Sequence, residues 1–199
     1  MNAPARKAAA ATLEDLLAIP EDERKRFELV EGAIADRGAT ASQHGRAQIR
    51  LARHTGPFDR RPGGRWPGGW WFTTEADVYF DAANTFRPDV AGWRRERVPE
   101  LPPGIPIKER PDWVCEILSS NKRNDLVKKK RVYHRHQVPH SWIVDPEQET
   151  LLVYRWMVDG YIKVQVAERG DVVRPEPFDA VPLVVGVLFG DDDEGEPDP

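Results

Sequence analysis

The sequence predicts an α/β domain in which a central mixed β-sheet is flanked by helices. Segments with the periodicity of amphipathic helices alternate with short apolar segments typical of strands, in the order helix, strands, helix, strands. The length of 199 residues suits one domain with a substantial core. We therefore expect this domain to cover residues 12–190, with disordered tails at 1–11 and 191–199.

The first third of the domain is predicted to contain two helices and a hairpin. A capping-box pattern at residues 12–15 begins a short helix with leucines on one face. Residues 27–35 alternate in polarity around a Glu-Gly pair, which favours a β-hairpin. Ser42 is a candidate N-cap for a second helix, which should end at Gly56-Pro57 because proline cannot continue it.

The next segment alternates between loops and strands. Residues 56–69 are rich in glycine, proline and arginine and predict a mobile basic loop. Strand signals follow at 70–80, 86–93 and 113–118, with a proline-rich excursion before the last of them.

A basic helix and three strands complete the predicted domain. The helix begins near residue 121, and Leu126 and Tyr133 share the face that Lys129 also occupies, so Lys129 should point toward the sheet. Residues 140–146 predict a strand that ends in a turn, and residues 151–166 predict a hairpin across Asp159-Gly160.

Composition limits the class of protein. The net charge is −4, but residues 191–199 hold six acids and no base, so residues 1–190 carry a net charge of +2. The lone cysteine, Cys115, excludes an internal disulfide framework and suits a reducing compartment. No export signal and no long apolar segment is present, so we expect a cytoplasmic protein that does not span a membrane.

Two carboxylates in apolar surroundings predict a metal site. Glu116 interrupts the apolar run 113–118, and Asp89 stands at the mouth of the apolar stretch that follows it. An unpaired buried carboxylate costs several kcal/mol, so a proton, a cation or a metal must accompany it. Taken alone, Asp89 could be an ordinary acid at a strand end, and Glu116 could form a buried salt bridge with Arg87 or Lys129.

Several ordered motifs resemble a known family. They are Phe27-Glu28-Leu29-Val30-Glu31-Gly32, His44-Gly45, Glu75, Arg87-Pro88-Asp89-Val90, Val114-Cys115-Glu116-Ile117-Leu118-Ser119, Asp125-Leu126 with Lys129 and Tyr133, and Ser141-Trp142-Ile143-Val144-Asp145-Pro146. Together they resemble the Uma-type endonuclease family, a branch of the PD-(D/E)XK restriction-endonuclease-like superfamily. The likeness covers roughly residues 12–190 and implies a restriction-endonuclease-like fold.

The resemblance implies that Asp89 and Glu116 hold Mg²⁺ or Mn²⁺ near a scissile phosphate, with a lysine beside the attacking water. Hard dications prefer carboxylate oxygens and retain water, which suits this chemistry. The superfamily's simplest pattern would place lysine two residues after Glu116, where this chain has Leu118. Lys129 on the following helix matches the role instead, and Lys128 or Lys130 would take its place if the helical register were shifted by one.

Three further residues match family segments less specifically. Glu75 is a candidate additional metal ligand, or else an exposed strand acid. Glu28 could be a site residue or face solvent on its hairpin, and His44 could be a site residue or merely cap or pack. His134 and His136 cannot chelate one ion, because residues two apart on a helix point about 200° apart.

The expected partner is DNA, and the expected reaction is metal-dependent phosphodiester hydrolysis. The candidate phosphate-binding residues are Lys122, Arg123, Lys128 and Lys130, although a basic helix face can also be merely solvated. A homodimer is an inference from the resemblance alone. The alternatives are a catalytically inactive nuclease-fold module that binds nucleic acid or another partner, and a metal-dependent phosphoesterase that acts on small molecules.

Overall fold

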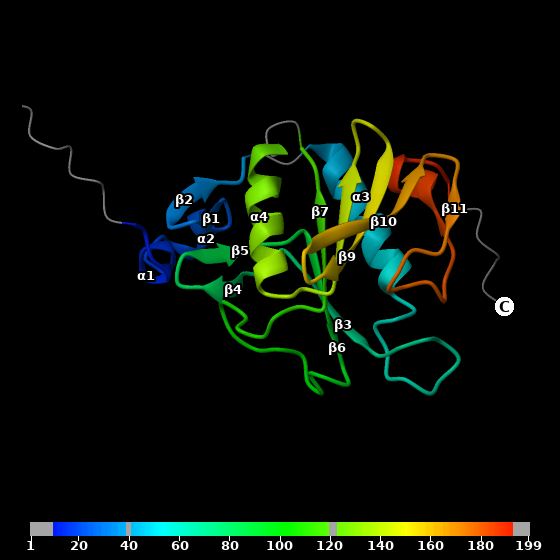
Figure 1. Cartoon of the computed structure of the whole chain (residues 1–199), viewed down its shortest axis with the longest axis horizontal. Coiled ribbons are helices and arrows are strands. Elements are labelled where there is room, and N and C mark those ends of the chain that lie inside the picture. The colour runs from blue at the N-terminus through cyan, green and yellow to red at the C-terminus, as the bar shows by residue number, and fades with distance from the viewer. Residues whose placement is uncertain (1–9, 39–40, 120–122, 193–199) are drawn as a thin grey trace, which may run out of the picture.

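The computed structural model describes residues 10–38, 41–119 and 123–192, and is built around a six-stranded sheet (Figure 1). The strand order is β10 (Gly160–Glu168), β9 (Thr150–Met157), β8 (His140–Asp145), β7 (Trp113–Ile117), β6 (Val90–Arg94) and β3 (Trp70–Thr74). Within this sheet β7 and β8 pair in parallel, whereas the other neighbours are antiparallel. The mixed sheet predicted from the sequence is therefore confirmed.

A second, antiparallel sheet lies beside the first. Its order is β2 (Ala33–Asp36), β1 (Phe27–Val30), β5 (Asn84–Phe86) and β4 (Val78–Asp81). The predicted hairpin is confirmed, since Val30 pairs with Ala33 across a two-residue turn in which Glu31 and Gly32 both have positive φ, 51° and 75°. The short helices α1 (Leu13–Leu17) and α2 (Glu21–Arg24) precede this hairpin, and the predicted capping box at Thr12 is present.

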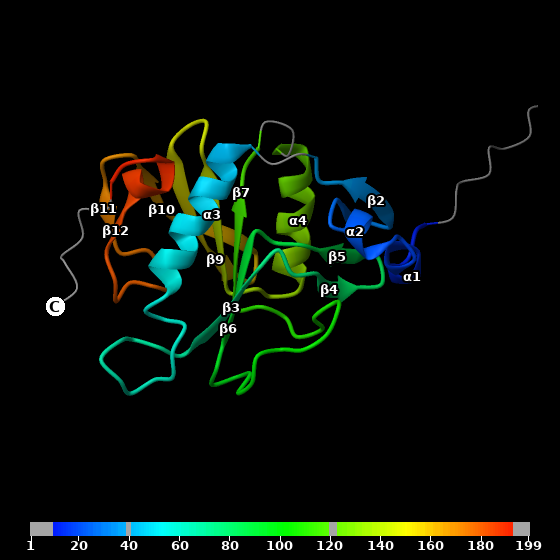
Figure 2. The same cartoon turned by 180° about the vertical axis from the view of Figure 1, so that it is seen from behind.

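Helices cover both faces of the large sheet. Figure 1 shows α4 (Arg123–Arg135) in front of the sheet, and Figure 2 shows α3 (Ser42–Thr55) on the opposite side, beside the 3₁₀ helix η1 (Val185–Phe189). Side chains alternate along β7, so Trp113, Cys115 and Ile117 join the core on the α3 side, whereas Val114 packs on the α4 side. Glu116 follows the same alternation and points toward α4.

Two predicted strands are interrupted, and both interruptions serve the site described below. The predicted strand 70–80 breaks at Glu75, whose φ of 53° ends β3 and lets the chain enter the smaller sheet as β4. The predicted strand 86–93 breaks at Arg87-Pro88-Asp89, between β5 in the smaller sheet and β6 in the larger one. The prediction of one continuous strand was wrong in both places, because a local apolar pattern does not indicate where the chain passes from one sheet to another.

Other local predictions had mixed outcomes. Ser42 is the first helical residue of α3 rather than its cap; Ala41 holds the cap position and provides no side-chain hydrogen bond. The basic helix, the strand at 140–145 and the β9–β10 hairpin are confirmed. A short pair, β11 (Val172–Val173) and β12 (Leu183–Val184), was not predicted.

The described region includes the inner ends of both predicted tails. The backbone amide of Ala11 donates to the carbonyl of Gly32, and Asp191 forms an ion pair with Arg169. The rest of each tail, residues 1–9 and 193–199, lies outside the described residues. Within the described ranges, every helix is too short or too polar to cross a lipid bilayer.

Candidate active site at the junction of the two sheets

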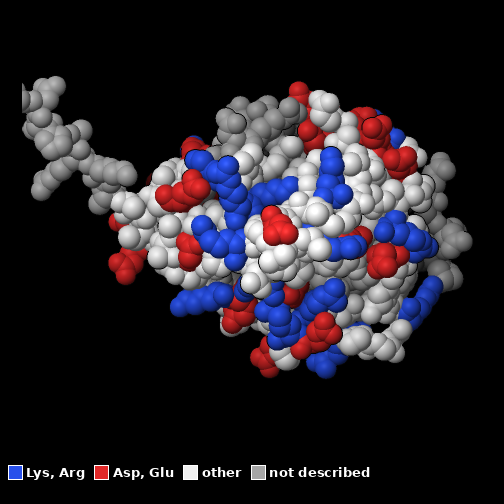
Figure 3. Space-filling model, in the orientation of Figure 1, with Lys and Arg blue, Asp and Glu red and all other residues white. Residues whose placement is uncertain are grey.

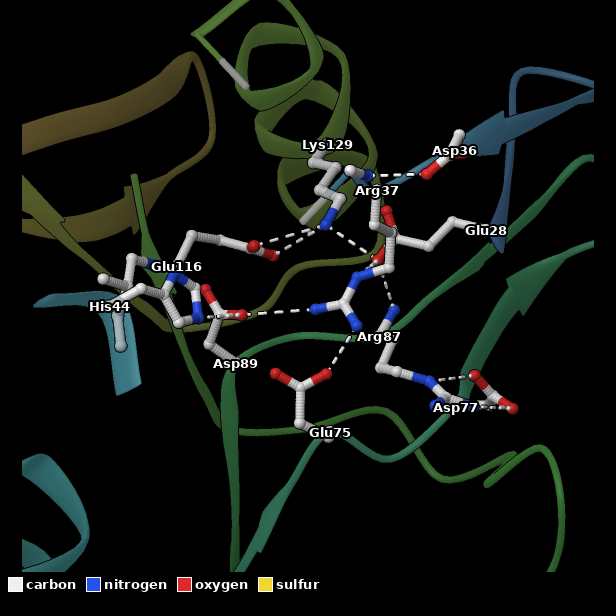
Figure 4. A network of polar contacts seen from close by, with 12 residues as sticks. Glu28, Asp36, Arg37, His44, Glu75, Asp77, Arg87, Asp89, Glu116 and Lys129 are labelled. Atoms are coloured by element: carbon white, nitrogen blue, oxygen red, sulfur yellow. Dashed lines mark hydrogen bonds and ion pairs between the residues drawn. The ribbon is translucent and has the colours of Figure 1, made fainter. Parts of the chain in front are cut away.

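A buried polar cluster lies where the two sheets and the two long helices meet (Figure 4). It contains Glu28 on β1, Arg37 after β2, His44 on α3, Glu75 after β3, Asp89 before β6, Glu116 on β7 and Lys129 on α4. The side chain of Glu75 is 34% exposed, and the other six are exposed by 8% or less. Glu75 is therefore the member of the cluster that solvent reaches most easily.

Glu116 is held by two donors from α4. Lys129 Nζ lies 3.2 and 3.4 Å from its two carboxylate oxygens, and the Tyr133 hydroxyl donates to one of them at 2.5 Å. Burial raises the pKa of Glu116, an effect that the positive charge of Lys129 only partly offsets. The buried salt bridge to Lys129 that the sequence left as an alternative is present, whereas Arg87 pairs with Asp77 instead.

Lys129 links Glu116 to Glu28. Its ammonium group donates to Glu28 Oε1 at 2.9 Å. Burial alone would lower the pKa of Lys129, but the charges of Glu116 and Glu28 outweigh burial and raise that pKa above its ordinary value. Lys129 is therefore a permanent cation and hydrogen-bond donor at neutral pH.

The predicted helical register is confirmed by the neighbours of Lys129. Lys128 is exposed. Lys130 lies over the Tyr154 ring, with Nζ 3.0 Å from the ring centroid, on the side of α4 that faces β9 and β10. Of these three lysines only Lys129 reaches the cluster.

Asp89 is fixed by three groups from different segments. Its Oδ2 accepts a hydrogen bond from the backbone amide of Ile117 at 2.6 Å, and its Oδ1 lies 3.2 Å from both Arg37 Nη2 and His44 Nε2. Burial would raise the pKa of Asp89, but His44, the Ile117 amide and Lys129 together lower it. Asp89 is therefore ionised at neutral pH.

His44, Glu75 and Asp89 each offer one ligand atom, and the three atoms lie close enough together to bind one metal ion. These three atoms lie within 4.8 Å of one another. Neither buried ring nitrogen of His44 has a hydrogen-bond partner among the described residues, although Nε2 lies 3.2 Å from Asp89 Oδ1. Carboxylate oxygens suit Mg²⁺ or Mn²⁺, and an imidazole favours a transition metal, so the donor set fits Mn²⁺ especially well.

Glu28 is buried, so the alternative in which it faces solvent on its hairpin was wrong. Its Oε1 accepts from Lys129 and, at 2.7 Å, from the backbone amide of Arg87, and lies 3.5 Å from Arg37 Nε. Glu28 thus ties the small sheet to α4 and to the linker between β5 and β6.

Sequence reasoning missed two participants, Arg37 and Gln48. Gln48 donates to Glu75 Oε1 at 3.2 Å and to the Asp89 carbonyl at 2.8 Å. Arg37 contacts Glu28, Glu75 and Asp89 at once. A polar residue after a hairpin and a glutamine on a helix are both ordinary in sequence, so no local signal marks them.

The predicted phosphate-binding residues occupy different environments. Lys122 and the side chain of Arg123 lie outside the described residues. Lys128 is exposed, whereas burial, with a smaller contribution from Lys163, lowers the pKa of Lys130 to about 8. Figure 3 shows Lys and Arg side chains spread over the face that carries α4, interspersed with acidic ones.

Comparisons with known proteins agree with this architecture. A family described as "Putative restriction endonuclease", Uma2, matches residues 13–184. The crystal structure of a putative nuclease belonging to DUF820 from Anabaena variabilis is similar, with a TM-score of 0.73 and 23% identity over 89% of this chain and 97% of that one. No curated protein matches. Because the family match spans most of the sequence, the chain belongs to the Uma2 family of putative restriction endonucleases.

Proposed function

We propose that this protein is a metal-dependent endonuclease that hydrolyses phosphodiester bonds in DNA at the cluster around Asp89, Glu116 and Lys129. The observation that carries the proposal is that these three side chains, from the segment before β6, from β7 and from α4, share one buried cluster with a histidine whose ring nitrogens make no hydrogen bond to the described residues. Membership of the Uma2 family supports the same reading.

Asp89 and Glu116 would hold Mg²⁺ or Mn²⁺, with Glu75 and His44 as additional ligands. The charge of the cluster supports a dication, because its four carboxylates, Glu28, Glu75, Asp89 and Glu116, face only Arg37 and Lys129 as permanent cations among the described residues. When bound, such an ion polarises the phosphoryl oxygen and lowers the pKa of water.

The protein's own groups would position and stabilise the reacting phosphate. Lys129 is charged in the metal-free protein, and it would serve as a donor that offsets negative charge developing on the phosphate. Glu28 and Glu116 hold its ammonium group in place, and Tyr133 orients Glu116. The exposed Lys128 and the rest of the basic helix would contact the DNA backbone.

Cleavage of supercoiled plasmid and of single-stranded DNA tests this proposal. We expect cutting with Mn²⁺ or Mg²⁺, none with EDTA, and a loss of about 100-fold or more in Glu116→Gln. Glu100→Gln removes an exposed acid outside the cluster and should retain full activity. Undiminished cutting by a folded Glu116→Gln protein would refute the assignment of the site.

A rival function is a nucleic-acid-binding module without turnover. One observation favours it: Arg37 already bridges three carboxylates of the cluster, so part of their charge is neutralised internally. Calorimetry separates the two functions. Binding of DNA without binding of Mn²⁺ or Mg²⁺, by folded wild-type protein, would support the module.

A further inference from the structure

Arg37 occupies the middle of the candidate metal site. Its side chain is 8% exposed, and its guanidinium nitrogens lie 2.5 Å from Glu75 Oε2, 3.2 Å from Asp89 Oδ1 and 3.5 Å from Glu28 Oε1. Figure 4 shows the guanidinium pointing into the space between these three acids. Two of them, Glu75 and Asp89, also belong to the group of three that could hold an ion.

The oxygens that Arg37 contacts are the ones an ion would need. Asp89 Oδ2 accepts a 2.6 Å hydrogen bond from the backbone of Ile117, which leaves Oδ1 as the oxygen turned toward the cluster. On Glu75, Gln48 donates to Oε1 and Arg37 to Oε2. A guanidinium and a dication that share the same oxygens would also repel each other.

We propose that Arg37 is an internal counter-ion that occupies the metal site in the metal-free protein and must leave Glu75 and Asp89 before a divalent cation can bind. Arg37 therefore sets the affinity for metal. This inference rests on the proposed function, because it takes the ion to bind at Asp89 with Glu75 and His44 among its ligands.

Glu28 offers a partner for the displaced side chain. Arg37 keeps a third contact, to Glu28, which is not part of the group of three. A cavity of about 20 Å³, room for about one water molecule, lies next to it and is lined by Glu28, Arg37, Glu116 and Lys129, among others. Movement of the guanidinium toward Glu28 would keep its charge paired within the cluster and free both ligand oxygens.

Arginine suits this role better than lysine would. A planar guanidinium has five donors and can bridge several carboxylates at once, whereas an ammonium group is a compact point charge. The variant Arg37→Lys therefore retains the charge but loses much of the competition for Glu75 and Asp89. The variant Arg37→Gln loses both the positive charge and the competition for these carboxylates.

Titration of Mn²⁺ alone, followed by calorimetry and by the electron paramagnetic resonance of free Mn²⁺, tests the inference without DNA or turnover. We expect Arg37→Gln to bind Mn²⁺ about tenfold or more tightly than the wild type, and Arg37→Lys to fall between them. Arg26→Gln is the matched control: it removes the same charge from an arginine whose side chain is 68% exposed and pairs with Asp36 outside the cluster. It should bind Mn²⁺ as the wild type does.

Thermal unfolding with and without Mn²⁺ provides a second readout and reports whether each variant folds. Arg37→Gln should be less stable than the wild type without metal and should gain more from Mn²⁺, because the ion then replaces a missing cation. If the wild type binds Mn²⁺ and a folded Arg37→Gln or Arg37→Lys binds it equally or more weakly, the inference is wrong and the proposed metal site survives. If none of these proteins binds Mn²⁺, both fail.

Discussion

Removal of the Lys129 ammonium group should destabilise the fold by an amount that depends on pH. Lys129→Met keeps most of the side-chain volume but leaves Glu28 and Glu116, which are 4% and 6% exposed, without their shared cation. Loss of one partner of a buried ion pair costs roughly 3–5 kcal/mol. In a domain of this size that corresponds to a decrease of roughly 6–20 °C in melting temperature.

The sign of the pH dependence follows from Glu116. Its folded pKa is raised by burial, so between its unfolded and folded pKa values the folded protein holds a proton that the unfolded chain releases. Stability therefore falls as pH rises above about 4.3, the ordinary glutamate pKa, and through the folded pKa. Without Lys129 that folded pKa is higher still, so the deficit of Lys129→Met should be larger at pH 8 than at pH 5.

Urea unfolding at pH 5 and pH 8 measures both the loss of stability in Lys129→Met and the pH dependence of that loss. Lys128→Met removes a lysine from the exposed side of the same helix and should change the free energy of unfolding by no more than about 0.5 kcal/mol. A deficit below about 1 kcal/mol for Lys129→Met, or an equal deficit at both pH values, would contradict the reasoning. Either result would mean that Glu28 and Glu116 are not charged partners of Lys129.

Four further outcomes are expected. Tyr133→Phe should cost about 1.5–3 kcal/mol in urea unfolding, because Glu116 loses a charged hydrogen bond; no change would mean that the bond is not formed in solution. Asp77→Asn should cost roughly 3–5 kcal/mol, since the buried Arg87 loses its paired carboxylate; a neutral effect would contradict that pairing. Mn²⁺ at 100 times its dissociation constant should stabilise the wild type by about 2.7 kcal/mol, reversibly with EDTA; an unchanged melting temperature would argue against a metal site. Lys128→Ala should lower the magnitude of the slope of log DNA affinity against log salt by about 0.9, and an unchanged slope would exclude Lys128 from the proposed DNA surface.

The parts of the site that were predictable from sequence depend on local periodicity. The interrupted apolar run identifies Glu116 as buried, and the helical spacing from Leu126 to Tyr133 places Lys129 on the face toward it. These two side chains meet because a strand and the following helix pack face to face. That prediction does not depend on how segments that are distant in the sequence pack together.

The remaining parts depend on contacts between distant segments. Arg37 contacts acids at positions 28, 75 and 89, which come from both sheets. Glu75 reaches the cluster through a backbone break that apolar patterning does not signal, because continuous strand character runs across it. The burial of Glu28 likewise follows from the approach of α4, not from the hairpin that contains it.

The hydrogen bond between Glu28 and Lys129 spans 101 positions of the chain and has a consequence for biosynthesis. A ribosome must release the segment through α4 before the cluster can assemble, so a nascent chain that ends after β7 contains the acids of the cluster without the lysine. In such a chain Glu28 and Glu116 lack the cation that they share in the folded protein.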